Sequence, residues 1–210
     1  MNLIVSGMKR IIYILMASVV LMSAASQANA QMGKRYYVNM GWQFNGTPGN
    51  SFAKSAQGYG GYLESGFYIT PMFAVGGFMS FSTNNEYFDR VTYTFADQSA
   101  LTTDLSRSIY QVPFGSVLRL RFLRTEFQPY VEAKIGTEYS TQSSYMSTFV
   151  KRDSNWGVYA SPEVGLVWYP FEKADVGFQL AAYYSYSSNR NKDYDMRGIN
   201  NLGFKLGIAF

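Results

Sequence analysis

Nine charged side chains lie inside otherwise apolar stretches, and several are spaced two residues apart. Arg119 precedes Arg121 by two positions, and Glu132 precedes Lys134 by two. Side chains two residues apart share one face of a β-strand. The complete set is Glu64, Arg119, Arg121, Glu132, Lys134, Glu138, Glu163, Asp175 and Lys205. Because charges in a low-dielectric interior must be paired, we expect these residues to form a network of salt bridges.

A catalytic role of the glutamates is possible in principle, because two carboxyl groups can act together as general acid and base. Basic residues are interleaved with Glu64, Glu132, Glu138 and Glu163, which favours charge pairing over an active site. The chain contains no histidine, the usual general base and commonest metal ligand. It contains no cysteine, which excludes disulfides and thiolate metal sites. We therefore expect no enzyme, no metal site and no cofactor.

The last nine residues show most clearly which elements carry these charges. Bulky apolar residues alternate there with small ones, and Lys205 is the single charge on the small face. The bulky face consists of Leu202, Phe204, Leu206, Ile208 and Phe210. In a membrane barrel such a face meets lipid, while small residues line a cramped interior. We expect this strand to close a barrel against the first strand.

The same alternation predicts eight strands and no helix of useful length after the N-terminal segment. The predicted strands are Arg35–Phe44, Gly58–Ile69, Met72–Ser82, Ser108–Phe122, Gln128–Tyr139, Trp156–Tyr169, Ala174–Tyr186 and Leu202–Phe210. Their connections alternate long and short. The long ones include 83–107, in which Val91–Phe95 could form an extra projecting strand segment, and 140–155. Pro113 and Pro162 lie inside strands and predict bulges or locally broken pairing.

The charged face of these strands is also the face that carries most glycines, as expected of a narrow lumen and not of a solvated surface. Aromatic residues gather near the strand ends on the bulky face, as in the girdles of membrane barrels. The predicted fold is all-β, an eight-stranded antiparallel up-and-down transmembrane β-barrel. The alternative is a soluble lipocalin-like barrel, in which the bulky face would line a cavity for an apolar ligand.

Residues 1–30 form a predicted cleavable signal peptide, which leaves 31–210 as the barrel domain. Lys9 and Arg10 precede the apolar segment Ile11–Met22, and Ala28–Ala30 fits the small-residue cleavage rule. The apolar segment is too short to span a bilayer as an anchor. Translation could begin at Met1 or Met8. Removal of both basic residues lowers the net charge from +4 to +2, too little to suggest nucleic acid.

The chain resembles the small eight-stranded outer-membrane barrels of Gram-negative bacteria, of the OmpX, OmpA and opacity-protein type. The resemblance rests on the signal segment, Pro129–Gly136, Ser161–Gly165 and the terminal strand. It implies a protein exported by the general secretory pathway to the outer membrane. It also implies that the terminal aromatic and the alternate apolar residues before it are read by the outer-membrane assembly machinery. In this chain the signal residues are Phe204, Leu206, Ile208 and Phe210.

The expected function is non-enzymatic, because enzymes with this topology depend on histidine. Side chains fill an eight-stranded barrel, which disfavours a channel, although a pore of very small conductance is an alternative. We expect a monomer in the bilayer whose external loops bind a host or extracellular ligand or lipopolysaccharide, or support envelope integrity. Loops without a specific ligand are the other possibility. The loop residues are Lys54, Arg90, Lys151, Arg152, Arg190 and Lys192, with Tyr87, Phe88, Tyr93, Phe95, Tyr145, Phe149 and Tyr194.

Overall fold

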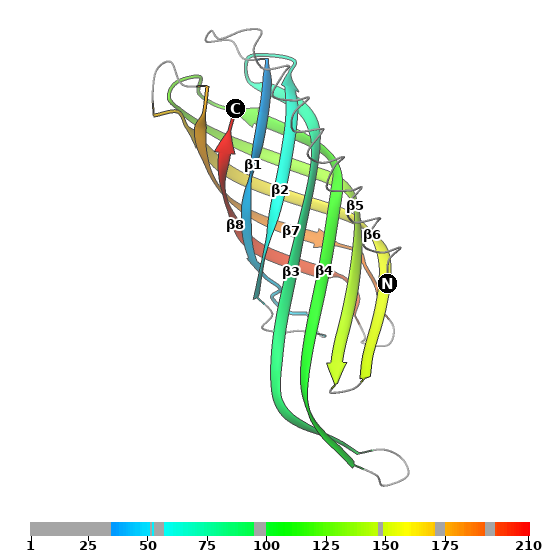
Figure 1. Ribbon diagram of the computed structural model, residues 1–210. Coiled ribbons are helices and arrows are strands. Elements are labelled where there is room, and N and C mark those ends of the chain that lie inside the picture. Colours follow the sequence, from blue (N-terminus) through cyan, green and yellow to red (C-terminus); the bar gives the residue numbers. More distant parts are fainter. Residues whose placement is uncertain are drawn as a thin grey trace, which may run out of the picture. The chain divides into compact units, whose positions relative to one another are not determined.

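The protein folds into a closed antiparallel β-barrel in which each strand pairs with the next and β8 pairs with β1 (Figure 1). This computed structural model describes residues 35–50, 52, 57–94, 100–146, 149–170, 175–191 and 196–210. The strands are β1 Tyr36–Gly46, β2 Gln57–Tyr68, β3 Phe73–Thr94, β4 Ala100–Arg121, β5 Phe127–Met146, β6 Phe149–Trp168, β7 Gly177–Ser187 and β8 Ile199–Ala209. The predicted fold class is confirmed. Within the described ranges, no helix is long and apolar enough to cross a membrane.

Several predicted features lie outside the described residues. They include the whole expected signal segment, and the surface residues Lys54, Phe95, Lys192 and Tyr194. For Arg90, Tyr93 and Phe149, the strand is described but the side chain is not.

The strands differ in length, and the long ones lie side by side. β3 and β4 each contain 22 residues and β5 and β6 each 20, whereas the other four strands contain 11 or 12. The predicted loops 83–107 and 140–155 are therefore mostly strand, and their prediction as loops is wrong. Small polar side chains pair across them, as between the Thr92 and Thr102 hydroxyls at 2.9 Å. Figure 1 shows β3 and β4 running on past the other strands.

The two strand prolines interrupt pairing without shifting its register. Opposite Pro113, β3–β4 pairing stops between Met79↔Phe114 and Ser82↔Gln111. Opposite Pro162, β6–β7 pairing stops between Ala160↔Tyr186 and Glu163↔Tyr183. Proline has no N–H to donate, so one side of each ladder opens locally. The predicted broken pairing is confirmed.

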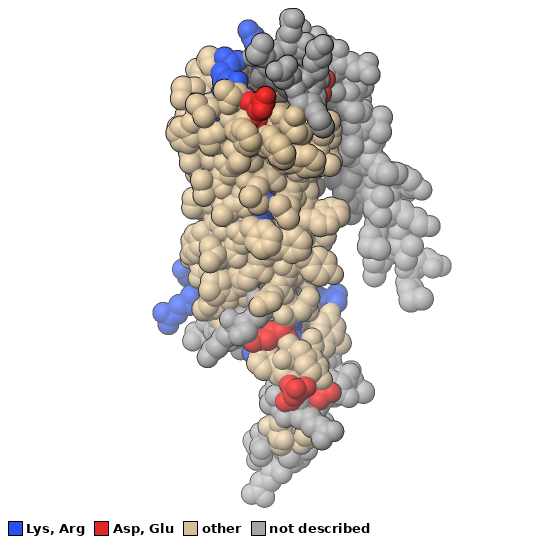
Figure 2. All heavy atoms as spheres, turned by 90° about the vertical axis from the view of Figure 1, so that its left-hand side faces the viewer, with Lys and Arg blue, Asp and Glu red and all other residues tan. Residues whose placement is uncertain are grey.

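The bulky face of the strands points outward. Trp42, Val158 and Leu202 each expose more than 60% of their surface, and alternate residues along every strand follow them. The charged face points inward, so the lipocalin-like alternative, which requires the reverse, is wrong. Figure 2 shows charged side chains gathered at the two ends of the visible face, with an almost uncharged band between them.

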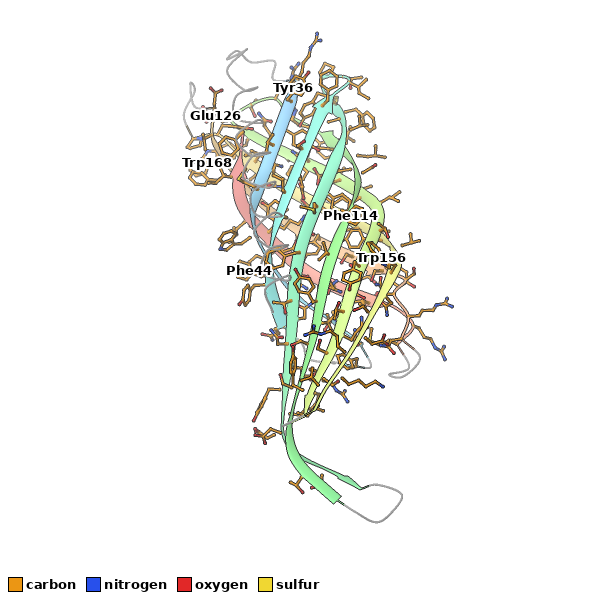
Figure 3. The ribbon with its side chains drawn as sticks, turned by 45° about the vertical axis from the view of Figure 1, so that its right-hand side comes forward. Tyr36, Phe44, Phe114, Glu126, Trp156 and Trp168 are labelled. Atoms are coloured by element: carbon orange, nitrogen blue, oxygen red, sulfur yellow. The ribbon has the colours of Figure 1, made fainter. Side chains whose placement is uncertain are left out.

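Aromatic side chains border this apolar band at two levels. Tyr36 and Trp168 lie toward the short-turn end, whereas Phe44, Phe114 and Trp156 lie toward the projecting hairpin (Figure 3). Rings contact one another within each level; for example, the ring centroids of Phe114 and Trp156 lie 6.2 Å apart. Tyr36 and Phe44 are eight residues apart on β1. Given the usual strand rise and tilt, that spacing corresponds to about 20 Å, close to the apolar height of membrane barrels.

Glycines in the wall make room for large side chains inside. Tyr62 on β2, Gly41 on β1, Gly207 on β8 and Gln179 on β7 are successive partners in the strand register. Because both glycines lack a side chain, Tyr62 reaches across two strands and its hydroxyl donates to Gln179 Oε1 at 2.9 Å. A Cβ on Gly207 would clash with that hydroxyl. The interior is therefore filled by side chains that span it.

Candidate functional site

Three carboxylates converge on one ammonium group in the lumen. Lys134 Nζ lies 2.5 Å from Glu64 Oε1, 3.0 Å from Glu132 Oε2 and 2.5 Å from Glu163 Oε2. These residues come from β2, β5 and β6, and each is at most 4% exposed. The register places Glu132 directly opposite Glu163, a repulsive arrangement of like charges. Lys134, one inward position further along β5, offsets that repulsion by bridging both carboxylates.

Two further cations complete this group. Lys205 Nζ contacts Glu64 Oε1 at 2.7 Å and Glu163 Oε2 at 2.8 Å. Arg119 pairs with Glu132 through its Nε and lies 3.6 Å from Glu64 Oε2 through Nη2. We call Glu64, Arg119, Glu132, Lys134, Glu163 and Lys205 the ionic cluster. It contains three acids and three bases, so its formal charge is zero.

Tyrosine rings hold the Arg119 guanidinium on both sides. Its Cζ lies 3.8 Å from the Tyr37 ring centroid and 4.2 Å from that of Tyr130. A guanidinium between aromatic faces gains cation–π stabilisation while its edge remains free for carboxylates. Tyr37 and Tyr130 lie opposite Gly66 and Gly165, where a Cβ would clash with the rings. These glycines allow the two rings to lie against the wall.

Arg121 lies in the lumen but outside the ionic cluster. Its guanidinium donates to Gln128 Oε1 at 3.0 Å and to the Pro71 carbonyl at 2.9 Å, and stacks 3.9 Å from the Tyr68 ring. The expected salt-bridge network is therefore wrong for Arg121, which forms no ion pair within the described residues. The register sets Arg121 opposite Tyr130, one inward position closer to the turn, and directs it to the short-turn end.

Glu138 and Asp175 also lie apart from the ionic cluster. Glu138 is fully buried further along β5 and accepts a hydrogen bond from Ser187 Oγ at 2.8 Å. Within the described ranges, no lysine or arginine forms an ion pair with it. Asp175 is exposed at a bend before β7 and does not point into the lumen. The predicted network is therefore wrong for both residues.

The sequence reasoning missed a second polar group in the lumen. Asn45 Nδ2 donates to Asn84 Oδ1 at 3.0 Å and to Asn201 Oδ1 at 3.2 Å, and Asn201 Nδ2 donates to Gln111 Oε1 at 3.1 Å. We call these four residues the amide cluster. Asn45 and Asn84 continue the inward period of β1 and β3, so period two alone could have found them. Their polarity led to their prediction as loop residues.

Apolar side chains cover both ends of the interior. At the end toward the projecting hairpin, Phe52, Ile109, Met196 and Ile199 form a buried cluster. Arg107 holds Phe52 there, since its Nη1 donates to the Phe52 carbonyl at 2.5 Å and its guanidinium lies 5.0 Å from the ring. At the short-turn end, buried clusters form around Tyr130 with Val167 and around Tyr37 with Tyr68.

The family model for the outer membrane protein β-barrel domain matches residues 14–210. The chain belongs to this outer-membrane β-barrel family. It is thus an integral protein of a Gram-negative outer membrane, as predicted from the resemblance. In such barrels the short turns face the periplasm, so we expect the projecting hairpin of β3 and β4 to lie outside the cell.

Solved structures of outer-membrane barrels are similar to this barrel. Neisserial surface protein A superimposes with a TM-score of 0.57 at 13% identity, covering 84% of this chain and 96% of that one. Ail of Yersinia pestis, in complex with the heparin analogue sucrose octasulfate, superimposes with a TM-score of 0.47 at 16% identity, covering 83% of this chain and 97% of that one. The outer membrane protease OmpT of Escherichia coli superimposes with a TM-score of 0.47 at 8% identity, covering 83% of this chain and 95% of that one. These likenesses show the fold alone. No curated protein matches the chain significantly.

The ionic cluster of this outer-membrane barrel is poorly suited to a metal ion. Ligand atoms of Glu64, Glu132 and Glu163 lie within 4.8 Å of one another, a spacing that could hold a cation. Lys134 Nζ already lies within 3.0 Å of all three carboxylates. An added cation would have to displace a buried ammonium group, which could not remain unpaired there. The arrangement is suited to filling the lumen.

Proposed function

We propose that this outer-membrane barrel is non-enzymatic, has a closed lumen, and uses its external sheet to bind a partner at the cell surface. The observation that carries the proposal is the inequality of the strands. Strands β3 to β6 are almost twice as long as the other four, and we expect the extra length to lie outside the membrane.

The closed lumen is supported by its layered filling. The ionic cluster is balanced in charge and buried, and apolar clusters cover the interior toward both ends. An ion entering this interior would have to break buried salt bridges and displace packed side chains. Steady conduction, the alternative role as a very small pore, is therefore disfavoured.

The external sheet supports surface interaction because, within the described ranges, part of the edge of each outer strand has no other strand beside it. Pairing between β2 and β3 ends at Gln57↔Asn85, and pairing between β6 and β7 begins at Tyr159↔Ser187. Beyond these pairs, within the described ranges, β3 has only β4 and β6 has only β5 as strand neighbours. The segment 188–191 follows β6 as far as Asp153, since Ser188 N–H donates to the Val158 carbonyl at 2.9 Å and Asn191 Nδ2 donates to Asp153 Oδ2 at 2.7 Å. On β6, therefore, only the residues before Asp153 extend past that segment. Unpaired strand edges can add a strand from another chain through backbone hydrogen bonds.

The surface chemistry of this region fits a polar macromolecule. Lys151, Arg152 and Arg190 are exposed near the β6 edge, and Tyr87 and Tyr145 are exposed on the long strands. Aromatic and basic side chains are the types that contribute most to binding energy at protein interfaces. Together with the strand edges that extend past their neighbours, they favour an extended protein segment as partner. Polysaccharide and lipopolysaccharide phosphates are the other classes to test.

Truncation of the projecting hairpin tests this function. Residues 87–106 would be replaced by an Asn-Gly turn, which suits a two-residue hairpin joining the paired residues Glu86 and Arg107. We expect the barrel to insert normally and to keep its faster migration on gels when unboiled. Cells carrying it should lose adhesion to a panel of immobilised serum proteins that retains cells with the full-length chain. Heparin and lipopolysaccharide in the same panel distinguish the other partner classes. Equal adhesion by both strains would contradict the proposed role.

We also propose that the barrel inserts as a monomer and that its terminal strand is read by the outer-membrane assembly machinery. Phe210 is 37% exposed, and its backbone N–H donates to the Val38 carbonyl at 2.8 Å. Deletion of Phe210 should lower the fraction of protein inserted in cells while changing the stability of the finished barrel little. Phe210→Tyr, which keeps the aromatic ring, is the matched control. Normal insertion after the deletion would contradict this role.

A further inference from the structure

Within the described residues, Glu138 is a buried carboxylate without a counter-charge. The residue is 0% exposed, its Oε1 accepts from Ser187, and its Oε2 has no hydrogen-bond partner in that part of the chain. Within the described ranges, every ion pair that involves a buried lysine or arginine belongs to the ionic cluster. That cluster is already balanced and has no charge to spare. Since an unpaired buried charge is strongly unfavourable, Glu138 must take up either a proton or a bound cation to become neutral.

The surroundings of Glu138 contain more acceptors than donors. Asn189 Nδ2 carries two hydrogens but faces four oxygens: Ser140 Oγ at 2.7 Å, Asn155 Oδ1 at 2.9 Å, Asn155 O at 3.1 Å and Glu138 O at 3.3 Å. Among the described residues, none donates to the buried Asn189 Oδ1. Exchanging the amide atoms would point this oxygen at the same acceptors. In this part of the chain, Glu138 Oε2 and Asn189 Oδ1 are therefore both buried acceptors without a positive or donating partner.

The neighbouring wall is built from small or short residues. Pro113 on β4 and Gly157 on β6 are the direct register partners of Glu138, and Gly136 is the preceding inward residue on β5. Asn189 packs over Gly157, where a Cβ would clash with it. No long side chain from these positions approaches the free carboxylate oxygen to neutralise it.

A line of polar side chains joins this site to the outer rim of the barrel. Asp153 is only partly buried, and Asn191 Nδ2 donates to its Oδ2 at 2.7 Å. Asn191 Nδ2 also reaches Gln142 Oε1 at 3.3 Å, and Gln142 Nε2 donates to Ser140 Oγ at 2.9 Å. Ser140 Oγ in turn accepts from Asn189. The line begins at one carboxylate and ends near another, which favours entry of a cation over entry of an anion.

We propose that Glu138 Oε2 and Asn189 Oδ1 bind a small monovalent cation of the Na⁺ or K⁺ class inside the external half of the lumen. One carboxylate with neutral oxygens balances one positive charge. Divalent Ca²⁺ usually takes six to eight oxygens, several from carboxylates. The site lies apart from the ionic cluster and does not depend on what the external sheet binds.

Cation-dependent unfolding tests this site. The refolded full-length barrel would be unfolded with urea in detergent micelles at equal ionic strength in NaCl, KCl, LiCl or N-methyl-D-glucamine chloride. We expect a higher urea midpoint in at least one alkali salt than in the bulky organic cation, because a ligand that binds only the folded state stabilises it. Glu138→Gln should remove this difference. Asp89→Asn, which removes one exposed acid of the projecting hairpin, should retain it.

Equal midpoints of the wild-type barrel in all four salts would overturn the proposal, as would the same salt dependence in Glu138→Gln. A variant that fails to fold leaves the wild-type salt series decisive. Crystals grown in RbCl supply a second measurement. They should show an anomalous-scattering peak within coordination distance of Glu138 Oε2, and a site without that peak at high RbCl concentration would also reject the cation.

Discussion

The two polar groups in the lumen fill the same barrel by different physical means. The periplasmic half holds the ionic cluster, in which six formal charges cancel among side chains from β2, β4, β5, β6 and β8. The external half holds the amide cluster of Asn45, Asn84, Gln111 and Asn201, which carries no charge. Each charged side chain of the ionic cluster needs opposite charges beside it, because only then is the cluster neutral as a whole. Members of the amide cluster need only a hydrogen bond.

This difference implies unequal tolerance to substitution. Loss of one member of a buried ion pair leaves an uncompensated charge, whereas loss of one amide leaves an unpaired dipole. The ionic half should therefore dominate the stability of the barrel and the specificity of its register. The amide half should accept change at a lower cost.

Lys134→Met should produce the largest effect, because three carboxylates lose the ammonium group they share. We expect the free energy of unfolding to fall by about 3–5 kcal/mol or more, because breaking a buried ion pair usually costs that much. Urea unfolding of the refolded protein in detergent measures it. Lys151→Met, on the external sheet, is the matched control and should change it by no more than about 0.5 kcal/mol. Similar losses in both variants would remove the contrast between the two halves.

Paired removal of Glu132 and Arg119 sharpens the comparison. Glu132→Leu alone leaves an excess positive charge and should destabilise the barrel by about 3 kcal/mol or more. Addition of Arg119→Met restores balance, because Glu64 and Glu163 then face Lys134 and Lys205. The double variant should be more stable than Glu132→Leu, and a double-mutant cycle measures the coupling. Purely additive losses would show that charge balance does not govern this half.

Asn201→Ala should have the smallest effect of the three. It removes contacts to Asn45 at 3.2 Å, Gln111 at 3.1 Å and Ser185 at 3.2 Å. An unpaired neutral group costs about 1–3 kcal/mol, and Asn45 and Gln111 keep hydrogen bonds to Asn84 at 3.0 Å and Ser82 at 3.2 Å, so the loss should stay below that of Lys134→Met. The same urea titration measures it, with Asn200→Ala on the outward face as control. A loss equal to that of Lys134→Met would contradict the ranking.

Much of the architecture was predictable because side chains alternate strictly in strands. Period two identified all eight strands and the inward direction of eight of the nine charges. Arg119 and Glu132, two members of the expected network, are direct partners in the register of β4 and β5. The outer limits of β3 to β6 were missed, because polar strands outside a membrane lack the apolar alternation that reveals strands within it. Asp175 was misplaced because its strand begins only at Gly177.

The sequence by itself determined the closed eight-stranded form, the lipid-facing surface and the charged interior, since each depends on periodicity along one strand or on a hairpin neighbour. Only the tertiary structure decided which charges meet. Glu64 contacts Lys134 and Lys205 across 70 and 141 residues of chain. These contacts depend on strand tilt and on the register at closure, which set the height of each side chain in the lumen. For the same reason Glu138 lies further along β5 than the ionic cluster, beside Ser187, where no lysine or arginine of the described residues pairs with it.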